Sequence, residues 1–259
     1  MLVKNASRLV INWWGGWHHA TPTRASGFCY INDCVLSIKS LKRKFCKILY
    51  VDIDIHHGDG VERFFLDDPN VFTLSFHVFS PGFFPGTGQF DHFNFDQCQQ
   101  HSLNIPFKEG LSDDTFVPVF HKVLSLVMSS FSPDAIVCQC GVDGLSRDPI
   151  GCGNLTSKSF TAAVHCVQAL KLPVIYLGGG GYNRSDSARV FTQMTAEILK
   201  TSGYDVSSIS DTDDIPEHEY FNEYGPDFTF ETSPGSRRDH NTEKHINEIC
   251  QAVNSCFVK

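Results

Sequence analysis

Three aspartates and two histidines lie within the eight residues from Asp52 to Asp59, directly after the apolar run 48–51. In an extended chain alternate side chains point the same way, so Asp52, Asp54 and His56 share one side. Three such groups at a buried strand end would repel one another or stay poorly solvated without a cation between them. The spacing therefore predicts a metal site, and the alternative is an ordinary polar turn after a strand.

A catalytic zinc site needs a small set of protein ligands and an open coordination position. We assign Asp54, His56 and the distant Asp143 as these ligands. Two carboxylates and one imidazole balance the charge of Zn²⁺ and leave room for water and a substrate carbonyl. The predicted chemistry is therefore metal-assisted hydrolysis.

Two adjacent histidines, His18 and His19, follow a glycine pair and a tryptophan. They need not share one role: one would accept a proton from water, and the other would adjust the charge of the site or protonate a leaving amine. Each imidazole needs a carboxylate to fix its tautomer, and Asp52 and Asp59 are the candidates. The alternative is a polar surface loop after a glycine turn.

Four glycines, Gly178–Gly181, precede Tyr182. A glycine run costs backbone entropy, and a close approach of the backbone to a ligand is one reason to bear that cost. A neutral phenol hydroxyl at this position could stabilise the oxyanion of a tetrahedral intermediate. A phosphate-binding loop is the competing interpretation, but the Gly-Lys-Ser/Thr sequence that would follow in such a loop is absent.

Phe28 and Phe84 lie in loops rich in glycine and proline, within Gly27-Phe-Cys-Tyr and Gly82-Phe-Phe-Pro. Both loops are expected near the same face as the metal residues. Exposed aromatic side chains in such loops can line a narrow apolar channel. The alternative is that each phenylalanine forms a small core within its own loop.

Apolar runs and helical periodicity define the elements that must position these residues. Buried strands are predicted at 9–14, 48–51, 71–77, 102–106, 135–140 and 173–177, and helices at 33–44, 113–130, 159–170, 185–200 and 245–258. Asn32 is expected to cap the first helix, whose inner face carries Val35, Ile38 and Leu41.

Strands that alternate with helices predict an α/β fold: a three-layer, predominantly parallel β-sheet with helices on both faces. In such sheets, ligands bind beyond the carboxyl ends of the strands. His18–His19, Asp54–His56, Asp143 and Tyr182 each follow a different predicted strand. We therefore expect one convergent site at that edge rather than four unrelated polar turns.

The composition of the chain limits the kinds of molecule that it is expected to bind. The chain has 259 residues, a formal net charge of −8 and ten cysteines without a Cys-x-x-Cys pair. The acidic balance argues against direct nucleic-acid binding and weakly favours a cationic peptide. No apolar run approaches the length of a membrane span, and an intracellular, reduced compartment is the simplest interpretation.

Taken together, these residues resemble the class I zinc-dependent histone deacetylases. The matching motifs are Gly-Gly-Trp-His-His-Ala, Ala-Ser-Gly-Phe-Cys-Tyr, Asp-Ile-Asp-Ile-His-His-Gly-Asp-Gly-Val-Glu, Pro-Gly-Phe-Phe-Pro-Gly-Thr-Gly, Cys-Gly-Val-Asp and Leu-Gly-Gly-Gly-Gly-Tyr-Asn. The resemblance covers nearly the whole chain. Trp17 and Ser80–Phe84 are most similar to the type-eight isoform, whereas Cys140 and Asn154–Thr156 are closer to other class I members.

The resemblance implies an arginase/deacetylase-like fold and a hydrolase that removes acetyl groups from lysine side chains of histones and other proteins. It implies that Asp54, His56 and Asp143 bind the metal, which would be Zn²⁺ or, alternatively, Fe²⁺. Acetylated histone tails, chromatin-associated partners and a location in nucleus and cytoplasm follow from the same resemblance, as does the expectation that the chain binds neither nucleic acid nor membrane directly.

The resemblance also assigns roles to the remaining residues. It pairs His18 with Asp52 and His19 with Asp59, makes His19 the general base, and makes Tyr182 the group that polarises the substrate carbonyl. The residues that it places around the acetyl-lysine channel are Gly27, Phe28, Phe84, Gly180 and Tyr182. Those that it places around a structural K⁺ are Asp52, Asp54, His56, Ser75 and Phe76. A peripheral K⁺ would fall near Phe65, Asp68, Val71 and His101, where Asp68 and His101 depart from the family pattern.

Family members begin well upstream of the predicted strand at 9–14. The resemblance therefore implies that residues 1–259 are a single deacetylase catalytic domain without its N-terminal part. Two other functions remain as alternatives. One is an arginase-like metal hydrolase of guanidino groups or small amides, and the other is an inactive truncated fragment that binds partners through its surface.

Overall fold

The computed structural model describes residues 2, 7–89, 101–207 and 214–257. Six strands form one sheet in the order β1-β6-β5-β2-β3-β4, and all neighbouring strands are parallel. The strands are β1 (Leu9–Asn12), β2 (Ile48–Asp52), β3 (Val71–Val78), β4 (Ser102–Phe107), β5 (Ala135–Gln139) and β6 (Val174–Leu177). The parallel α/β fold expected from the sequence is therefore confirmed.

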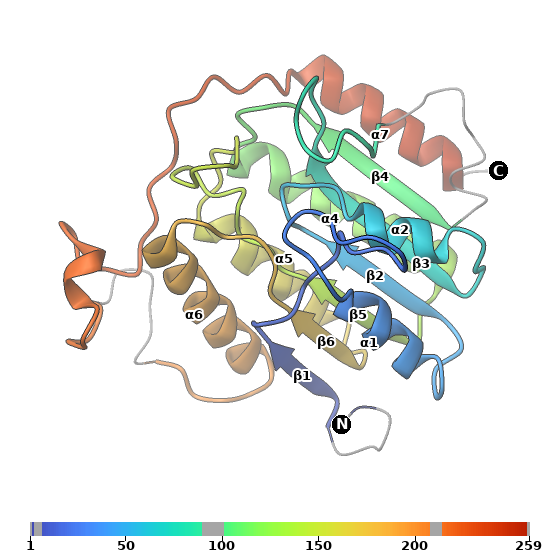
Figure 1. The fold of residues 1–259 in the computed structure, drawn as a ribbon, viewed down its shortest axis with the longest axis horizontal. Coiled ribbons are helices and arrows are strands. Elements are labelled where there is room, and N and C mark those ends of the chain that lie inside the picture. The colour runs from blue at the N-terminus through green and yellow to red at the C-terminus, as the bar shows by residue number, and fades with distance from the viewer. Residues whose placement is uncertain (1, 3–6, 90–100, 208–213, 258–259) are drawn as a thin grey trace.

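Helices cover both faces of this sheet (Figure 1). They are α1 (Asp33–Leu41), α2 (Asp59–Phe65), α4 (Asp113–Phe131), α5 (Ser157–Ala169), α6 (Arg184–Thr201) and α7 (Glu243–Phe257), with the short 3₁₀ helix η2 (Phe221–Tyr224). In Figure 1, α1 and α2 lie in front of the sheet, and α4 and α5 lie behind it. Among the described residues, no helix is both long enough and apolar enough to cross a membrane.

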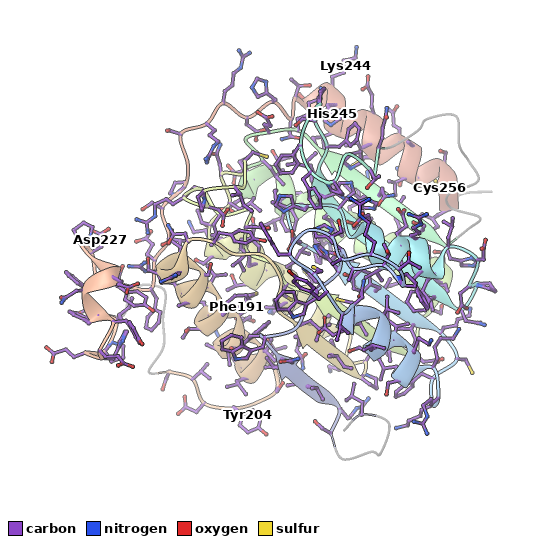
Figure 2. All side chains as sticks on the ribbon, in the orientation of Figure 1. Phe191, Tyr204, Asp227, Lys244, His245 and Cys256 are labelled. Atoms are coloured by element: carbon purple, nitrogen blue, oxygen red, sulfur yellow. The ribbon has the colours of Figure 1, made fainter. Side chains whose placement is uncertain are left out.

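The central strands divide their side chains between two apolar cores, because successive residues of a strand point to opposite faces. Ile48 and Tyr50 of β2 belong to the core under α1 and α2. Leu49 and Val51 belong to the larger core under α4, α5, α6 and α7. Figure 2 shows the side chains that fill these layers; Phe191 of α6 packs against the larger core, with its ring centroid 5.0 Å from that of Trp13.

Most helix boundaries shift by one or two residues from the sequence prediction, and two differences are larger. The helix predicted at 33–44 ends at Leu41, and the expected cap is present because the Asn32 side chain accepts a hydrogen bond from the Val35 N–H. Helix α2 is not predicted at all. It has seven residues, begins inside the polar motif and buries only Val61 and Phe65 as large apolar residues, so it shows too little periodicity to be recognised.

The strand order places a crevice at the centre of the sheet. From β2 the chain continues to β3 and β4 on one side, whereas from β5 it continues to β6 on the other side. Such a reversal between neighbouring strands opens a crevice beyond their carboxyl ends. Asp54 and His56 follow β2 and Asp143 follows β5, so the predicted metal ligands lie at this crevice.

Candidate active site

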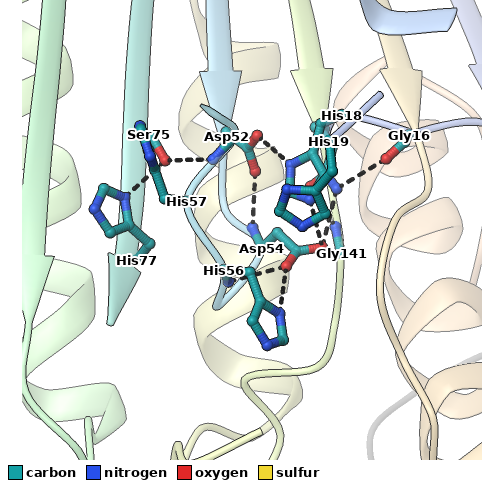
Figure 3. A network of polar contacts seen from close by, with 12 residues as sticks. Gly16, His18, His19, Asp52, Asp54, His56, His57, Ser75, His77 and Gly141 are labelled. Atoms are coloured by element: carbon teal, nitrogen blue, oxygen red, sulfur yellow. Dashed lines mark hydrogen bonds and ion pairs between the residues drawn. The ribbon is translucent and has the colours of Figure 1, made fainter. Parts of the chain in front are cut away.

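Asp54, His56 and Asp143 lie together beyond the ends of β2 and β5. One ligand atom from each lies within 4.8 Å of the others, and all three residues are buried. His56 Nδ1 lies 3.2 Å from Asp54 Oδ1 and 2.9 Å from Asp143 Oδ2. Figure 3 shows the Asp54 side of this group and the polar contacts around it. The structure thus brings the three predicted ligands to one point.

The protonation of this group shows why it suits a cation. Burial and the nearby charge of Asp54 raise the pKa of Asp143 to about 7. Burial opposes the charge on His56, but its contacts with Asp143 and Asp54 outweigh burial and raise the pKa of His56 to about 10. Without a metal ion, protons bound to His56 and Asp143 must therefore offset the negative charge of these crowded groups. A divalent cation would replace them, and the nitrogen and oxygen donors suit Zn²⁺ or Fe²⁺.

Backbone and side-chain donors fix the orientation of the Asp54 carboxylate. Gln139 Nε2 donates to Asp54 Oδ2 at 3.0 Å, and the Gly180 N–H donates to the same oxygen at 2.9 Å. A side chain at residue 180 would not fit, because its Cβ would lie 2.0 Å from Asp143 Oδ2. The glycine run before Tyr182 therefore allows a close approach of backbone to the metal ligands, and the Gly180 N–H is already used by a carboxylate rather than free for phosphate.

His18 and His19 each contact a different carboxylate. His18 Nδ1 lies 2.7 Å from Asp52 Oδ2, and His19 Nδ1 lies 2.7 Å from Asp59 Oδ1. Burial opposes the charge on His18, but Asp52 and Asp54 outweigh it and raise the pKa of His18 to about 9. Burial and the neighbouring charge of His18 lower the pKa of His19. Near neutral pH, His18 is therefore charged and His19 is neutral.

The N-terminal end of α1 holds the turn that carries both histidines. Asn32 Nδ2 donates to the carbonyls of His18 and Ala20, at 3.0 Å each, while its oxygen caps the helix. Asp33 Oδ1 accepts the Trp17 N–H at 2.9 Å. The cap that the helix pattern predicts therefore has a second role in positioning the paired histidines.

An apolar pocket opens onto His19 and His56. Its other lining residues are Gly27, Phe28, Gly82, Phe83, Phe84, Ile150 and Tyr182. Phe28 adopts a left-handed backbone conformation with φ of 64° and leaves 67% of its surface exposed, with its ring centroid 5.8 Å from that of Tyr182. The Phe84 ring meets His19 edge-on, with centroids 4.8 Å apart. The structure thus places four of the five predicted channel residues, Gly27, Phe28, Phe84 and Tyr182, around one opening. The fifth, Gly180, lines the adjoining pocket beside Asp54 instead.

Asp148 positions Tyr182 and the rim of the pocket. Its Oδ2 accepts the Tyr182 N–H at 2.7 Å, and its Oδ1 accepts the N–H groups of Ile150 and Gly151 at 3.0 and 2.9 Å. Burial, followed by the charges of the metal-ligand carboxylates, raises the pKa of Tyr182, so its phenol is neutral at physiological pH. A neutral phenol keeps the proton that an oxyanion donor needs.

Sequence reasoning missed Gln139, Phe83, Asp148 and Ile150. Gln139 is the polar last residue of β5, so the strand-end rule that indicates Asp143 could have found it. Phe83 stacks on His56 with ring centroids 4.9 Å apart and planes 4° apart, but the sequence does not distinguish it from Phe84. Asp148 and Ile150 lie in an irregular segment without a periodic signal.

The two groups of predicted K⁺ ligands differ in their surroundings. In the inner group, Ser75 is the register partner of Asp52 across β2 and β3, so these side chains lie next to each other at the crevice. In the peripheral group, the Asp68 carboxylate forms an ion pair with the Lys42 ammonium. An ammonium group therefore already neutralises Asp68. Both potassium sites stay predictions.

Comparison with known proteins relates this arrangement to one family. The histone deacetylase domain matches residues 1–198. The chain is 42% identical over 252 residues to histone deacetylase 8 of Xenopus laevis, which covers 97% of this chain and 75% of that protein. It is 42% identical to histone deacetylase 8 of Danio rerio, over 95% of this chain and 63% of that protein. It is 40% identical to histone deacetylase 1 of Homo sapiens, over 97% of this chain and 50% of that protein.

The fold and the site together define a parallel α/β protein with a candidate metal site beyond the carboxyl ends of its central strands. The chain belongs to the histone deacetylase family, and the resemblance to class I members, above all to the type-eight isoform, is confirmed. Members of this family are metal-dependent lysine deacetylases, and the arginase-like alternative is not better supported. The chain spans between one half and three quarters of the length of the three relatives described above.

Proposed function

We propose that this protein is a zinc-dependent deacetylase that hydrolyses N6-acetyl-lysine in histones and other proteins and releases acetate and free lysine. The observation that carries this proposal is the buried group Asp54, His56 and Asp143, whose His56 lines an apolar pocket together with His19 and Tyr182. Acetyl-lysine has an apolar stem that ends in an amide. The aromatic walls suit the stem, and the polar floor suits the amide.

Asp54, His56 and Asp143 would hold the zinc ion, with Fe²⁺ as the alternative. When bound, the ion supplies Lewis-acid polarisation of the acetyl carbonyl and makes water more acidic. Asp52, Asp54, His56, Ser75 and Phe76 would surround a structural K⁺ behind this group. The register pairing of Asp52 with Ser75 on neighbouring strands supports that placement.

His19 is the residue that moves protons. It is neutral and borders both the aromatic pocket and the adjoining pocket beside Asp54, whereas the charged His18 borders only the second. His19 accepts a proton from the attacking water and delivers it to the lysine nitrogen as the C–N bond breaks. Asp59 holds the other ring nitrogen of His19, which keeps the tautomer that can accept this proton.

His18 and Tyr182 stabilise the charges that this transfer creates. His18, paired with Asp52 and 3.8 Å from Asp54, would place a positive charge beside the metal ligands. Tyr182 donates a hydrogen bond to the carbonyl oxygen as negative charge develops there. Gly27, Phe28 and Phe84, with Gly180 and Tyr182, would enclose the acetyl-lysine side chain and exclude water from it.

Substrates and partners follow from the charge of the chain. The formal net charge of −8 supports acetylated, otherwise cationic histone tails as substrates and argues against direct binding of nucleic acid. We propose a nuclear location with a cytoplasmic share, chromatin-associated partners and no membrane association.

The test combines metal analysis with acetate release from an acetyl-lysine peptide, on the chain as given. One equivalent of zinc and chelator-sensitive acetate release are the expected result, with the unacetylated peptide as the blank. Zinc without acetate release would refute the catalytic proposal. Acetate release that survives complete removal of metal would refute the role of Asp54, His56 and Asp143.

A further inference from the structure

The loop 80–88 forms one wall of the pocket but has little backbone support of its own. It contains three glycines and two prolines. The backbone hydrogen bond within it runs from the Phe83 N–H to the Ser80 carbonyl, at 3.0 Å. Such a segment loses much conformational entropy on ordering. Yet it places Phe83 flat on His56 and Phe84 edge-on against His19. Something outside the loop must therefore hold it.

Two buried histidines hold the end of this loop. His77 Nε2 donates to the Gly88 carbonyl at 2.9 Å, and its Nδ1 lies 2.8 Å from Ser75 Oγ. His57 Nδ1 lies 2.8 Å from the hydroxyl of Thr87. The two imidazoles are fully buried, with ring centroids 4.6 Å apart. Figure 3 shows both histidines and the bond from His77 to Ser75.

Each histidine connects the loop to a different part of the sheet. His77 lies on β3 and is tied to Ser75 of the same strand. His57 Nε2 lies 3.1 Å from Glu62 Oε2 of α2, an ion-pair distance without a formed hydrogen bond. Glu62 in turn accepts hydrogen bonds from Ser102 and Asn104 of β4. The loop is thus anchored through side chains to β3, α2 and β4.

We propose that the buried pair His57–His77 positions the 80–88 wall of the pocket and thereby sets how tightly the acetyl-lysine side chain is held. Both are positioning residues, because neither lines the pocket or contacts the metal ligands through its ring. The inference rests on the proposed function, since it assigns the loop a role in binding acetyl-lysine. Gly88 supports it: its φ is 82°, and a Cβ there would lie 2.3 Å from His77 Nε2, so the loop is packed directly against the imidazole.

Two substitutions of His77 separate its two contacts. Asparagine can reach Ser75 from the position of Nδ1 but leaves the Gly88 carbonyl without a donor. Glutamine places an amide near the position of Nε2 and can donate to the Gly88 carbonyl, while it loses the contact with Ser75.

We expect His77→Asn to raise KM for an acetyl-lysine peptide roughly threefold to tenfold, the effect of one lost hydrogen bond, with kcat within about twofold of wild type. His77→Gln should restore KM toward the wild-type value. Equal KM in both variants and the wild type, or a fall in kcat at unchanged KM, would overturn the proposal.

The exposed Thr87 provides a second pair of variants that leaves the core intact. Thr87→Val removes the hydroxyl that meets His57, and Thr87→Ser keeps it. In a Tyr182→Phe background, which is expected to bind peptide without efficient turnover, the valine variant should bind the acetyl-lysine peptide more weakly than the serine variant. Equal dissociation constants would count against the proposal.

Amide hydrogen exchange distinguishes a failure of this inference from a failure of the proposed function, because it needs no substrate. We expect the 80–88 amides to exchange faster in Thr87→Val and His77→Asn than in Thr87→Ser and wild type. Faster exchange supports the anchoring whatever the activity of the wild type proves to be. Unchanged exchange in both variants would show that the histidine pair does not hold the loop, even in an active deacetylase.

Discussion

Replacing Asp148 by asparagine removes one acceptor from a carboxylate that serves two loops at once. One oxygen accepts the Tyr182 N–H, and the other accepts the N–H groups of Ile150 and Gly151. An amide has one oxygen and one NH₂ group, so it cannot accept on both sides. The orientation that keeps two bonds presents the oxygen to Ile150 and Gly151 and turns the NH₂ toward the Tyr182 N–H.

The expected cost follows from the lost contact. Asp148 is 2% exposed, so the lost hydrogen bond is a buried, charge-assisted one. Such bonds contribute about 1.5–3 kcal/mol. For a chain of this size, each kcal/mol corresponds to a shift in Tm of roughly 2–4 °C. We therefore expect Asp148→Asn to lower Tm by roughly 3–12 °C.

The catalytic effect should exceed what the loss of stability explains. The facing donors push the backbone at Tyr182 away from Asp148, so the phenol loses its place beside the substrate carbonyl. We expect kcat to fall by about tenfold or more, because a misplaced oxyanion donor stabilises the transition state less. Thermal denaturation and steady-state kinetics well below Tm measure the two effects separately, and metal content should be unchanged.

Asp134→Asn is the matched control. Asp134 also accepts two backbone N–H groups, from Cys46 and Lys47, but both meet the same oxygen and the residue is remote from the site. An amide oxygen can keep both bonds, so Tm and kcat should stay close to wild type. If Asp148→Asn behaves like this control, with full kcat and unchanged Tm, the carboxylate does not position Tyr182 and the reasoning is wrong.

Three further predictions concern the site and its surroundings. Tyr182→Phe should keep the metal but reduce kcat by a factor on the order of 10²–10³, as for a lost oxyanion donor; unchanged turnover in a kinetic assay would make Tyr182 structural. Asp143→Ala should lose the metal, and full zinc occupancy by metal analysis would remove Asp143 from the ligands. Burial alone would raise the pKa of Glu62, but the ion-pair contact with His57 and the hydrogen bonds from Ser102 and Asn104 outweigh it and lower this pKa from 4.5 to about 2. Because the folded-state pKa is the lower one, the stabilisation is present above pH 4.5 and is lost as the pH falls toward 2. It amounts to about 3 kcal/mol at most. The difference in unfolding free energy between wild type and Glu62→Gln, from urea denaturation, should shrink over that range, and a constant difference would contradict the prediction.

The elements with a strong local pattern were predictable from the sequence. The buried stripe Val35, Ile38 and Leu41 and the Asn32 cap identify α1, and apolar runs identify the strands. The order of the strands was not predictable in this way, because pairing depends on contacts between distant segments. The seven-residue helix α2 lies below the length at which a periodic pattern can be read.

The adjacent residues His56 and His57 show what the sequence determines and what only the tertiary structure decides. The sequence by itself determined which groups could do chemistry and that they follow strands, because apolar runs and alternation are local properties. Alternation already separates His56 from His57, but it could not show that His56 faces the Asp143 carboxylate or that His57 contacts Thr87 of the channel wall. Alternation sends adjacent side chains to opposite faces of the sheet. The pairing of β2 with β5 on one edge and with β3 on the other brings Asp143 and the 80–88 loop to these residues, and that pairing is a property of the tertiary structure alone.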